Sequence, residues 1–280
     1  MNGRGRLLPA LCTVLLAACG SVPEQPALIE DYRHYMRSAG EYYERGRLLL
    51  AMDYYQRALV EAELVDNHVR MTDSLYHIGL VALQVGDTGQ AAAALEFART
   101  LNAAAGDTDL ELLEAQVAYQ TGRHQQAIAI YSRLLSGRLS DTGAVSALNG
   151  RALAYLASDQ PDRARADAEQ ALQRVAGNDQ PALQSATRLN LAQIHARAGE
   201  LGRAEELARQ SLAIDRQRLA PPAIAADLYV LAGVLHAQGD SVQARELFRR
   251  AERIFTQTGQ AKQAEAARIR RQNISRETAR

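Results

Sequence analysis

The chain of 280 residues is poor in the side chains that most catalytic and metal sites need. Lysine occurs once, at Lys262, so no glycine-rich phosphate loop ending in Gly-Lys-Ser/Thr is present. The two cysteines, Cys12 and Cys19, both lie near the N-terminus, which leaves none for a disulfide or a thiolate zinc site in the rest of the chain. The histidines have no metal-ligand spacing, and no Gly-x-Ser-x-Gly motif occurs. These scarcities argue against an enzyme, a metal site and a bound cofactor.

Large aromatic residues are also scarce, with no Trp and three Phe in the whole chain. A core therefore has to be built mainly from Ala and Leu. Small side chains let helices approach one another closely, which is typical of helical repeat proteins. The composition thus favours an all-helical protein.

The formal net charge is zero, but the charge is distributed unevenly. Residues 19–140 carry 10 Arg and 16 acidic residues, a net charge of −6, whereas residues 141–280 carry 20 Arg or Lys and 16 acidic residues, a net charge of +4. Such an imbalance can orient a partner, but it is too weak to indicate binding of nucleic acid.

The N-terminal segment has the composition of a secretory signal. Arg4 and Arg6 precede an apolar run over residues 7–18, and small residues follow at its end. No other apolar run approaches the roughly 20 residues of a membrane-spanning helix. We therefore expect a secreted protein with no transmembrane helix.

The end of this segment, Leu16-Ala17-Ala18-Cys19, resembles the lipobox of bacterial lipoproteins. The resemblance implies cleavage before Cys19 and attachment of acyl chains to it. Gly20 follows, where an Asp would resemble an inner-membrane retention signal, so we expect a lipid anchor on the periplasmic face of the outer membrane. The alternatives are an ordinary secretory signal cut elsewhere, or a cytoplasmic protein with an apolar N-terminus.

A Gly-x4-Ala phrase recurs along the chain at intervals of 36–40 residues, with Asp159 in place of Gly in one copy. Gly adopts the left-handed conformation that ends a helix and turns the chain back. A small residue such as Ala is needed where the two helices of such a hairpin cross. The residues that define the repeat are Gly46, Ala51, Gly86, Ala91, Gly122, Ala127, Ala164, Gly199, Ala204, Gly239 and Ala244.

This pattern resembles the tetratricopeptide repeat, a helix-turn-helix unit of roughly 34 residues. The resemblance covers about residues 30–258 and implies an α-solenoid of about six units. The period here is nearer 40 residues, and the closing proline of the family is missing from most units. The sequence thus divides into a signal peptide (1–18), the lipidated Cys19 with a tether (19–29), the repeat array (30–258), and a C-terminal capping helix and tail (259–280).

The resemblance also suggests where a partner binds, because solenoids usually bind on the concave groove lined by the first helix of each unit. Asn190 is similar to an asparagine that binds peptide backbone in this family, but no Lys or Arg pair completes a carboxylate clamp. The tyrosines at such positions offer a rigid apolar body and a polar tip; the alternative is that they only fill space between units. The expected groove residues are Tyr43, Tyr76, Tyr119, Asn149, Asn190, Tyr229 and His236.

Together these features predict a non-enzymatic scaffold that binds a protein partner and contacts the membrane through its lipid, with no nucleic acid and no small-molecule substrate. The architecture resembles that of lipoproteins that assist type IV pilus secretins, which favours a role in assembling an envelope complex. One alternative is an adaptor that regulates peptidoglycan hydrolases or proteases of the envelope. A second is a cytoplasmic regulatory module, if the N-terminal motif is not a lipobox.

Overall fold

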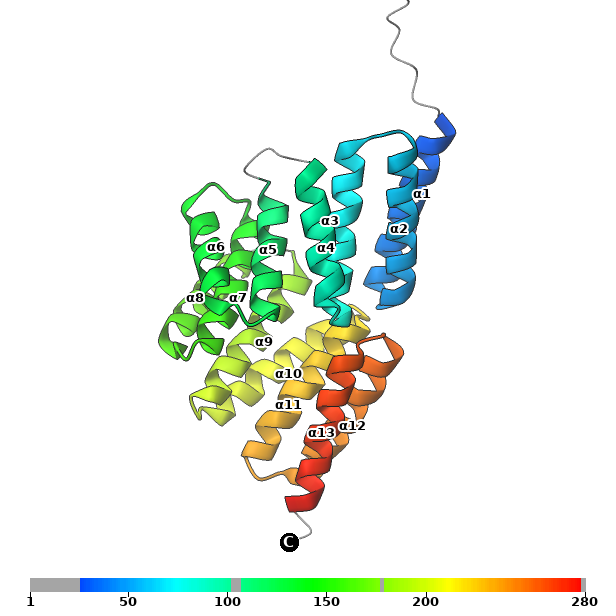
Figure 1. The fold of residues 1–280 in the computed structure, drawn as a ribbon. Coiled ribbons are helices and arrows are strands. Elements are labelled where there is room, and N and C mark those ends of the chain that lie inside the picture. Colours follow the sequence, from blue (N-terminus) through cyan, green and yellow to red (C-terminus); the bar gives the residue numbers. More distant parts are fainter. Residues whose placement is uncertain (1–25, 102–106, 177–178, 278–280) are drawn as a thin grey trace, which may run out of the picture.

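The computed structural model describes residues 26–101, 107–176 and 179–277. Within these ranges the chain forms thirteen helices and no strand, which confirms the predicted all-α solenoid (Figure 1). The helices are α1 (Pro26–Glu44), α2 (Leu48–Leu64), α3 (His68–Val85), α4 (Thr88–Leu101), α5 (Thr108–Gln120), α6 (His124–Ser136), α7 (Asp141–Ala157), α8 (Pro161–Val175), α9 (Pro181–Arg197), α10 (Leu201–Gln217), α11 (Pro221–Ala237), α12 (Ser241–Gln257) and α13 (Ala261–Glu277).

Successive helices pack as six antiparallel pairs, from α1 with α2 to α11 with α12, and α13 packs against α12 at the end of the array. The predicted signal peptide, Cys19 and the beginning of the tether lie outside the described residues. The first helix begins at Pro26, so residues 26–29, which were expected to belong to the tether, form the first turn of α1. Proline suits this position because the first amides of a helix have no intrahelical partner. No helix in the described ranges combines the length and apolar character needed to cross a membrane.

The turns inside the pairs share one backbone form. In the second pair, Gly86 has a φ of +87°, its N–H donates to the carbonyl of Leu83, and the N–H of Asp87 donates to the carbonyl of Ala82. This is the Schellman arrangement that ends a helix through a left-handed residue. In the fourth pair Asp159 takes that place with a φ of +58°. Aspartate adopts this conformation more readily than most residues with a Cβ.

The alanines of the repeated phrase lie where the helices of each pair meet. All six are fully buried, so a larger side chain at any of them would collide with the facing helix. They are Ala51, Ala91, Ala127, Ala164, Ala204 and Ala244.

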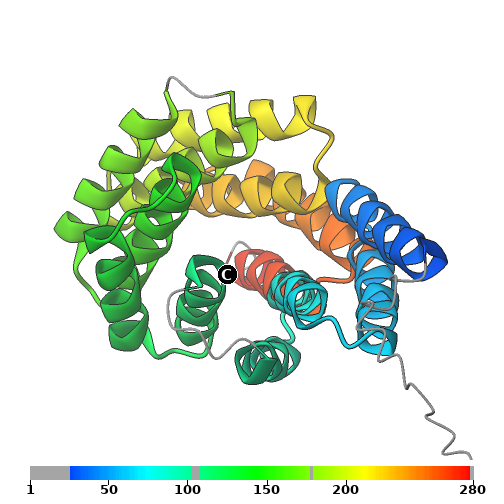
Figure 2. The same cartoon turned by 90° about the horizontal axis from the view of Figure 1, so that it is seen from above.

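The stack of helix pairs curves because the first helices of neighbouring pairs lie closer together than the second helices do. The first helices of neighbouring pairs pack on one another, as in α3 with α5, α5 with α7, α7 with α9 and α9 with α11. No two second helices in the described part of the chain share a contact of that extent. The odd-numbered helices therefore line the inner side of the curve, and the chain winds through about one turn (Figure 2).

The two ends of this turn meet through polar contacts between the C-terminal end of α3 and the start of α13. The side-chain amides of Gln260 and Gln263 both donate to the carbonyl of Gln84, each at 3.2 Å. The ammonium group of Lys262 donates to the carbonyl of Gly86. These bonds join the turn between α3 and α4 to the start of α13, across about 176 residues of sequence.

Close packing accompanies these bonds. A Cβ atom at Gly46, in the turn between α1 and α2, would lie 2.5 Å from Cδ of Pro222 at the start of α11. A Cβ at Gly259 would lie 3.0 Å from Cγ of Leu49. The first pair therefore rests on the loops that precede α11 and α13, and the solenoid is closed on itself.

Two helical glycines give substitutions with opposite expected effects. A Cβ at Gly150 in α7 would lie 2.3 Å from Cζ of Tyr131, whose side chain is fully buried, so Gly150→Ala should lower the free energy of unfolding by about 1–3 kcal/mol. Gly233 in α11 has no atom within 4 Å of its Cβ position, so Gly233→Ala should raise it by roughly 0.5–1 kcal/mol. Denaturant unfolding measures both, and equal effects of the two substitutions would refute this packing argument.

Candidate binding site

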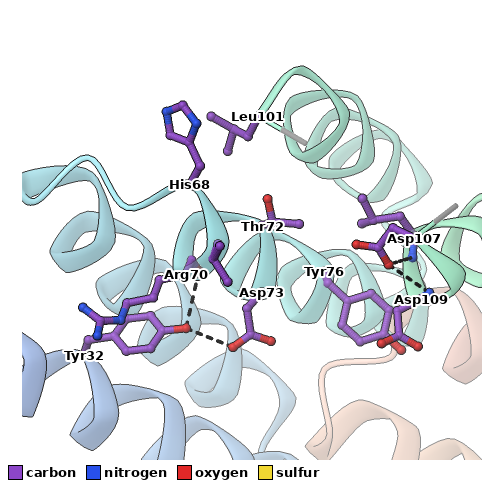
Figure 3. Close-up of a pocket in the computed structure, with 11 residues that line it drawn as sticks. Tyr32, His68, Arg70, Thr72, Asp73, Tyr76, Leu101, Asp107 and Asp109 are labelled. Carbon is purple, nitrogen blue, oxygen red and sulfur yellow. Dashed lines mark hydrogen bonds between the residues drawn. The ribbon is translucent and has the colours of Figure 1, made fainter. Parts of the chain in front are cut away.

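A pocket of about 480 Å³ lies at the N-terminal ends of the inner helices α3 and α5, beside α1 and the end of α4. Its walls combine tyrosine rings, aliphatic side chains and carboxylates (Figure 3). The helix ends gather there because the first helices of neighbouring pairs run side by side with their starts at the same edge. The lining residues are Tyr32, His68, Val69, Arg70, Thr72, Asp73, Tyr76, Leu101, Asp107, Asp109 and Leu110.

Three carboxylates face this pocket. Asp73 in α3 accepts a hydrogen bond of 2.9 Å from the hydroxyl of Tyr32. Asp107 caps α5, and its Oδ1 accepts from the backbone N–H groups of Asp109 and Leu110 at 3.1 and 3.2 Å. Asp109 follows in the first turn of α5. The cap fixes one carboxylate, and the tyrosine hydroxyl orients another.

The charges act on the neighbouring titratable groups. Burial, and then the charge of Asp107, raise the pKa of the Asp109 carboxyl. Burial, helped by Asp109, raises the pKa of Tyr76 to about 12. Burial also lowers the pKa of His77, although Asp73, whose Oδ1 lies 3.6 Å from the Nε2 of His77, and Asp109 act in the opposite direction. The pocket therefore has a negative potential at its α3–α5 side.

The one permanent positive charge among the lining residues stands at the other side of the pocket. The guanidinium carbon of Arg70 lies 5.3 Å from the centre of the Tyr32 ring, over its face. Figure 3 shows Arg70 and Tyr32 together, away from Asp107 and Asp109. Between these two sides lies Thr72, which is 8% exposed and whose hydroxyl has no hydrogen-bond partner among the described residues.

The expected groove residues lie at separate places along the array, and among them Tyr76 alone lines this pocket. Tyr43 is half-buried at the closure of the turn: burial raises its pKa, and the nearby Arg218 acts in the opposite direction. The ring of Tyr119 packs against His124 with 5.6 Å between ring centres. This contact joins α5 to α6 within the third pair.

Asn149 and Asn190 lie on neighbouring inner helices, α7 and α9. Both are buried, at 7% and 8% exposure. The Nδ2 of Asn149 donates to the hydroxyl of Thr187 at 2.8 Å, while its Oδ1 has no partner in the described part of the chain. Asn149 is therefore partly occupied in joining the two helices.

The last two expected groove residues belong to the C-terminal end of the array. Tyr229 meets Phe248 edge to face, with 5.3 Å between ring centres, so it packs α11 on α12. The Nδ1 of His236 lies 3.3 Å from the hydroxyl of Ser241, and its Nε2 lies 3.3 Å from a carboxylate oxygen of Glu277 in α13. His236 therefore contacts the terminal helix.

The sequence predicts Asp107 and Asp109 only as a helix cap or solvated face, and it does not connect Asp73, Asp107, Asp109 or Thr72 with a binding site. The only signal was the acidic excess of residues 19–140. The three aspartates come together because α3 and α5 start at the same edge, which the spacing of the repeats indicates once the helix starts are known. Within the described residues, no group of three His, Cys, Asp or Glu side chains is arranged to hold a metal ion.

Family models for the tetratricopeptide repeat match residues 76–144, 143–217 and 183–257. Together they span residues 76–257 of the 280. The chain is a tetratricopeptide repeat protein. A comparison with curated proteins finds no match.

Solved structures with a similar fold come from several classes of protein. A Rap protein in complex with Competence and Sporulation Factor is 15% identical, with 89% of this repeat protein and 76% of that chain covered and a TM-score of 0.62. The Rap conjugation gene regulator of plasmid pLS20, in complex with a Phr peptide, is 16% identical, with coverages of 87% and 67% and a TM-score of 0.68. A signal-transduction ATPase with a tetratricopeptide repeat sensor, from Pyrococcus horikoshii, is 14% identical, with coverages of 85% and 39% and a TM-score of 0.58. At these identities the similarity concerns the fold alone.

Proposed function

We propose that this tetratricopeptide repeat protein is a non-enzymatic scaffold that binds a protein or peptide through its inner helices, while a lipid on Cys19 holds it at the periplasmic face of the outer membrane. The observation that carries the partner-binding part is the pocket at the starts of α3 and α5, with its tyrosine rings, aliphatic side chains and carboxylates. Open pockets with a few convergent polar groups are the usual form of a recognition site.

The similar structures support a peptide as one form of partner. One Rap protein was solved in complex with Competence and Sporulation Factor and the other with a Phr peptide, and their folds match most of this chain. The second candidate function follows from the same likeness: a regulatory adaptor whose partner affinity depends on a bound peptide. At the envelope, such an adaptor would act on peptidoglycan hydrolases or proteases. A chain without a lipid would instead be a regulatory module of the cytoplasm.

The anchor rests on the sequence motif that ends at Cys19. One fatty chain holds a protein on a membrane only marginally, whereas two or more give stable attachment. The lipid chemistry of bacterial lipoproteins supplies more than one chain, which would keep the array next to the bilayer. The assembly of an envelope complex, such as a pilus secretin, is the role that this location favours.

Crosslinking in living cells tests both parts of the proposal. The full chain with a C-terminal tag is crosslinked, purified from the membrane fraction and analysed by mass spectrometry beside a Cys19→Ala variant. We expect an acylated Cys19 and an envelope assembly component that is crosslinked only to the lipidated form. Hydrolases or proteases as the main partners would favour the adaptor, and an unmodified Cys19 in the soluble fraction would overturn the anchor.

A further inference from the structure

The two ends of the solenoid meet along a narrow contact, the seam. Figures 1 and 2 both show the first two helix pairs lying over α11–α13. Within the described ranges, no helix of the first two pairs packs on α11, α12 or α13 to the extent that consecutive helices of the array do. The seam thus consists of a few side-chain contacts. Its residues are Gly46, Leu49, Gln84 and Gly86 on one side and Pro222, Gly259, Gln260, Lys262 and Gln263 on the other.

The hydrogen bonds of the seam end on backbone carbonyls at the end of α3. The last carbonyls of a helix have no intrahelical partner and carry its partial negative charge. Here the carbonyl of Gln84 accepts from the amides of Gln260 and Gln263, and the carbonyl of Gly86 accepts from the ammonium group of Lys262. In an open ring, water would bind the same groups, so each bond favours closure by only a small net free energy.

Two buried atoms oppose the closure. The Oε1 atoms of Gln84 and Gln263 are buried and have no hydrogen-bond partner among the residues that the structure describes. A buried acceptor without a partner destabilises the state that buries it, and opening would expose both oxygens to water. Leu49, the aliphatic side chain beside Gly259, stays 64% exposed, so it adds little apolar burial. The forces for and against closure are therefore of similar size.

Opening the seam would leave the rest of the array intact. In a solenoid each unit contacts mainly its neighbours, so the packing between consecutive helices does not depend on whether the ends meet. Small rotations summed over the six pairs are enough to separate the ends. The first two pairs would then move away from the last ones, and the inner side of the curve would widen.

We propose that the seam is a latch. The ring opens reversibly at this place, held closed by Lys262 and opposed by the buried amide oxygens of Gln84 and Gln263. Lys262 is the only lysine of the chain, so a change at this one side chain removes the charged bond of the seam. The consequence for a partner, wider access to the inner helices, rests on the proposed function. The latch itself needs neither a lipid nor a partner.

Double electron–electron resonance on the full chain measures the opening. Cys12→Ser and Cys19→Ser remove the natural thiols, which also makes the result independent of a lipid. Spin labels are attached through Ala93→Cys in α4 and Asn273→Cys in α13, two exposed positions on opposite sides of the seam. The closed ring gives a short distance between the labels, and the open ring gives a longer one.

Lys262→Met keeps an unbranched side chain and removes the charged donor, so it should raise the ratio of open to closed rings about threefold to tenfold. Adding Gln84→Met should lower this ratio again by at least about threefold, because it removes a buried oxygen without a partner and keeps the backbone carbonyl. Arg270→Met is the matched control, since Arg270 is an exposed cation about two turns further along the same helix.

The latch would be overturned by an open fraction that Lys262→Met leaves unchanged, or that Arg270→Met raises equally. It would also be overturned if adding Gln84→Met had no effect or opened the ring further. Because this readout uses the free chain, a failure to crosslink any partner in cells would leave the latch standing, and a failed latch would leave the proposed function standing.

Discussion

Asp167→Ala is expected to lower the free energy of unfolding by about 1.5–3 kcal/mol, because it removes charge-assisted hydrogen bonds and leaves the partly buried guanidinium of Arg151 without its counter-ion. Asp167 in α8 accepts two hydrogen bonds from Arg151 in α7, at 2.7 and 2.8 Å, and the two side chains are 9% and 19% exposed. A third nitrogen of Arg151 donates to the hydroxyl of Ser132 at 3.1 Å. The ion pair thus joins the helices of the fourth pair and reaches back to α6.

Removing both charges should lower the free energy of unfolding far less than removing one. Arg151→Met combined with Asp167→Leu replaces the pair by apolar groups, and such exchanges are often neutral or stabilising. Urea unfolding of the single and double variants compares the two cases. The account of the Arg151–Asp167 pair would be refuted if Asp167→Ala lowered the free energy of unfolding by less than about 1 kcal/mol. It would also be refuted if the double variant lowered it as much as Asp167→Ala does.

The second large effect concerns Asp227 in α11, which is fully buried. The hydroxyl of Ser211 lies 2.6 Å from Oδ1 of Asp227 and 2.9 Å from the carbonyl oxygen of Ser185. A hydroxyl has one proton, so Ser211 can donate to only one of these acceptors. Both contacts are satisfied when Ser211 donates to the carbonyl and a protonated Asp227 donates to Ser211. The neighbouring Asp215 accepts hydrogen bonds from Ser185 and from Arg218.

This proton assignment agrees with the electrostatics. Burial raises the pKa of Asp227 from 3.8 to about 8, and the charge of Asp215 adds to the rise, while the bond with Ser211 acts against it. The folded state therefore keeps a proton that the unfolded state loses near pH 4. Because the folded state binds more protons over this interval, stability contributed by Asp227 is present below about pH 4 and is lost as the pH rises toward 8.

Asp227→Asn should remove this pH dependence, because an amide donates like the protonated acid and has no charge to desolvate. We expect the variant to gain stability relative to the wild type as the pH rises from 5 to 8, by at most about 1.4 kcal/mol per unit and by a few kcal/mol in all. Denaturant unfolding across this range measures the difference. A difference that stays constant from pH 5 to pH 9 would contradict the assignment.

Much of the fold could be predicted from the sequence because its rules act over short distances. A left-handed turn residue such as Gly86, followed by a buried small residue such as Ala91, specifies a helical hairpin within a dozen residues. Repetition of the hairpin then implies a solenoid. The aspartate at position 159 fits the same rule because its side chain tolerates a positive φ.

The closure of the solenoid could not be predicted, because it depends on small rotations summed over six pairs. The contact of Gln84 with Gln260 and Gln263 joins positions that no local pattern relates. The candidate site could not be predicted either, because it also depends on how neighbouring helices are placed. Family positions pointed to tyrosines and asparagines along the inner helices, whereas the pocket gathers Asp73 and Asp109 at the helix starts, where the order of neighbouring helices decides which side chains meet.

Site-specific photocrosslinking in living cells tests the central claim, that a protein partner occupies the pocket on the inner helices. Replacing Tyr76 with p-benzoylphenylalanine places the crosslinker in the pocket, and replacing Val242, which is 71% exposed at the start of α12, gives the control position. We predict a crosslinked envelope protein at Tyr76 and none of it at Val242. A partner that crosslinks at Val242 and not at Tyr76 would contradict the account and move the binding surface to the outer helices.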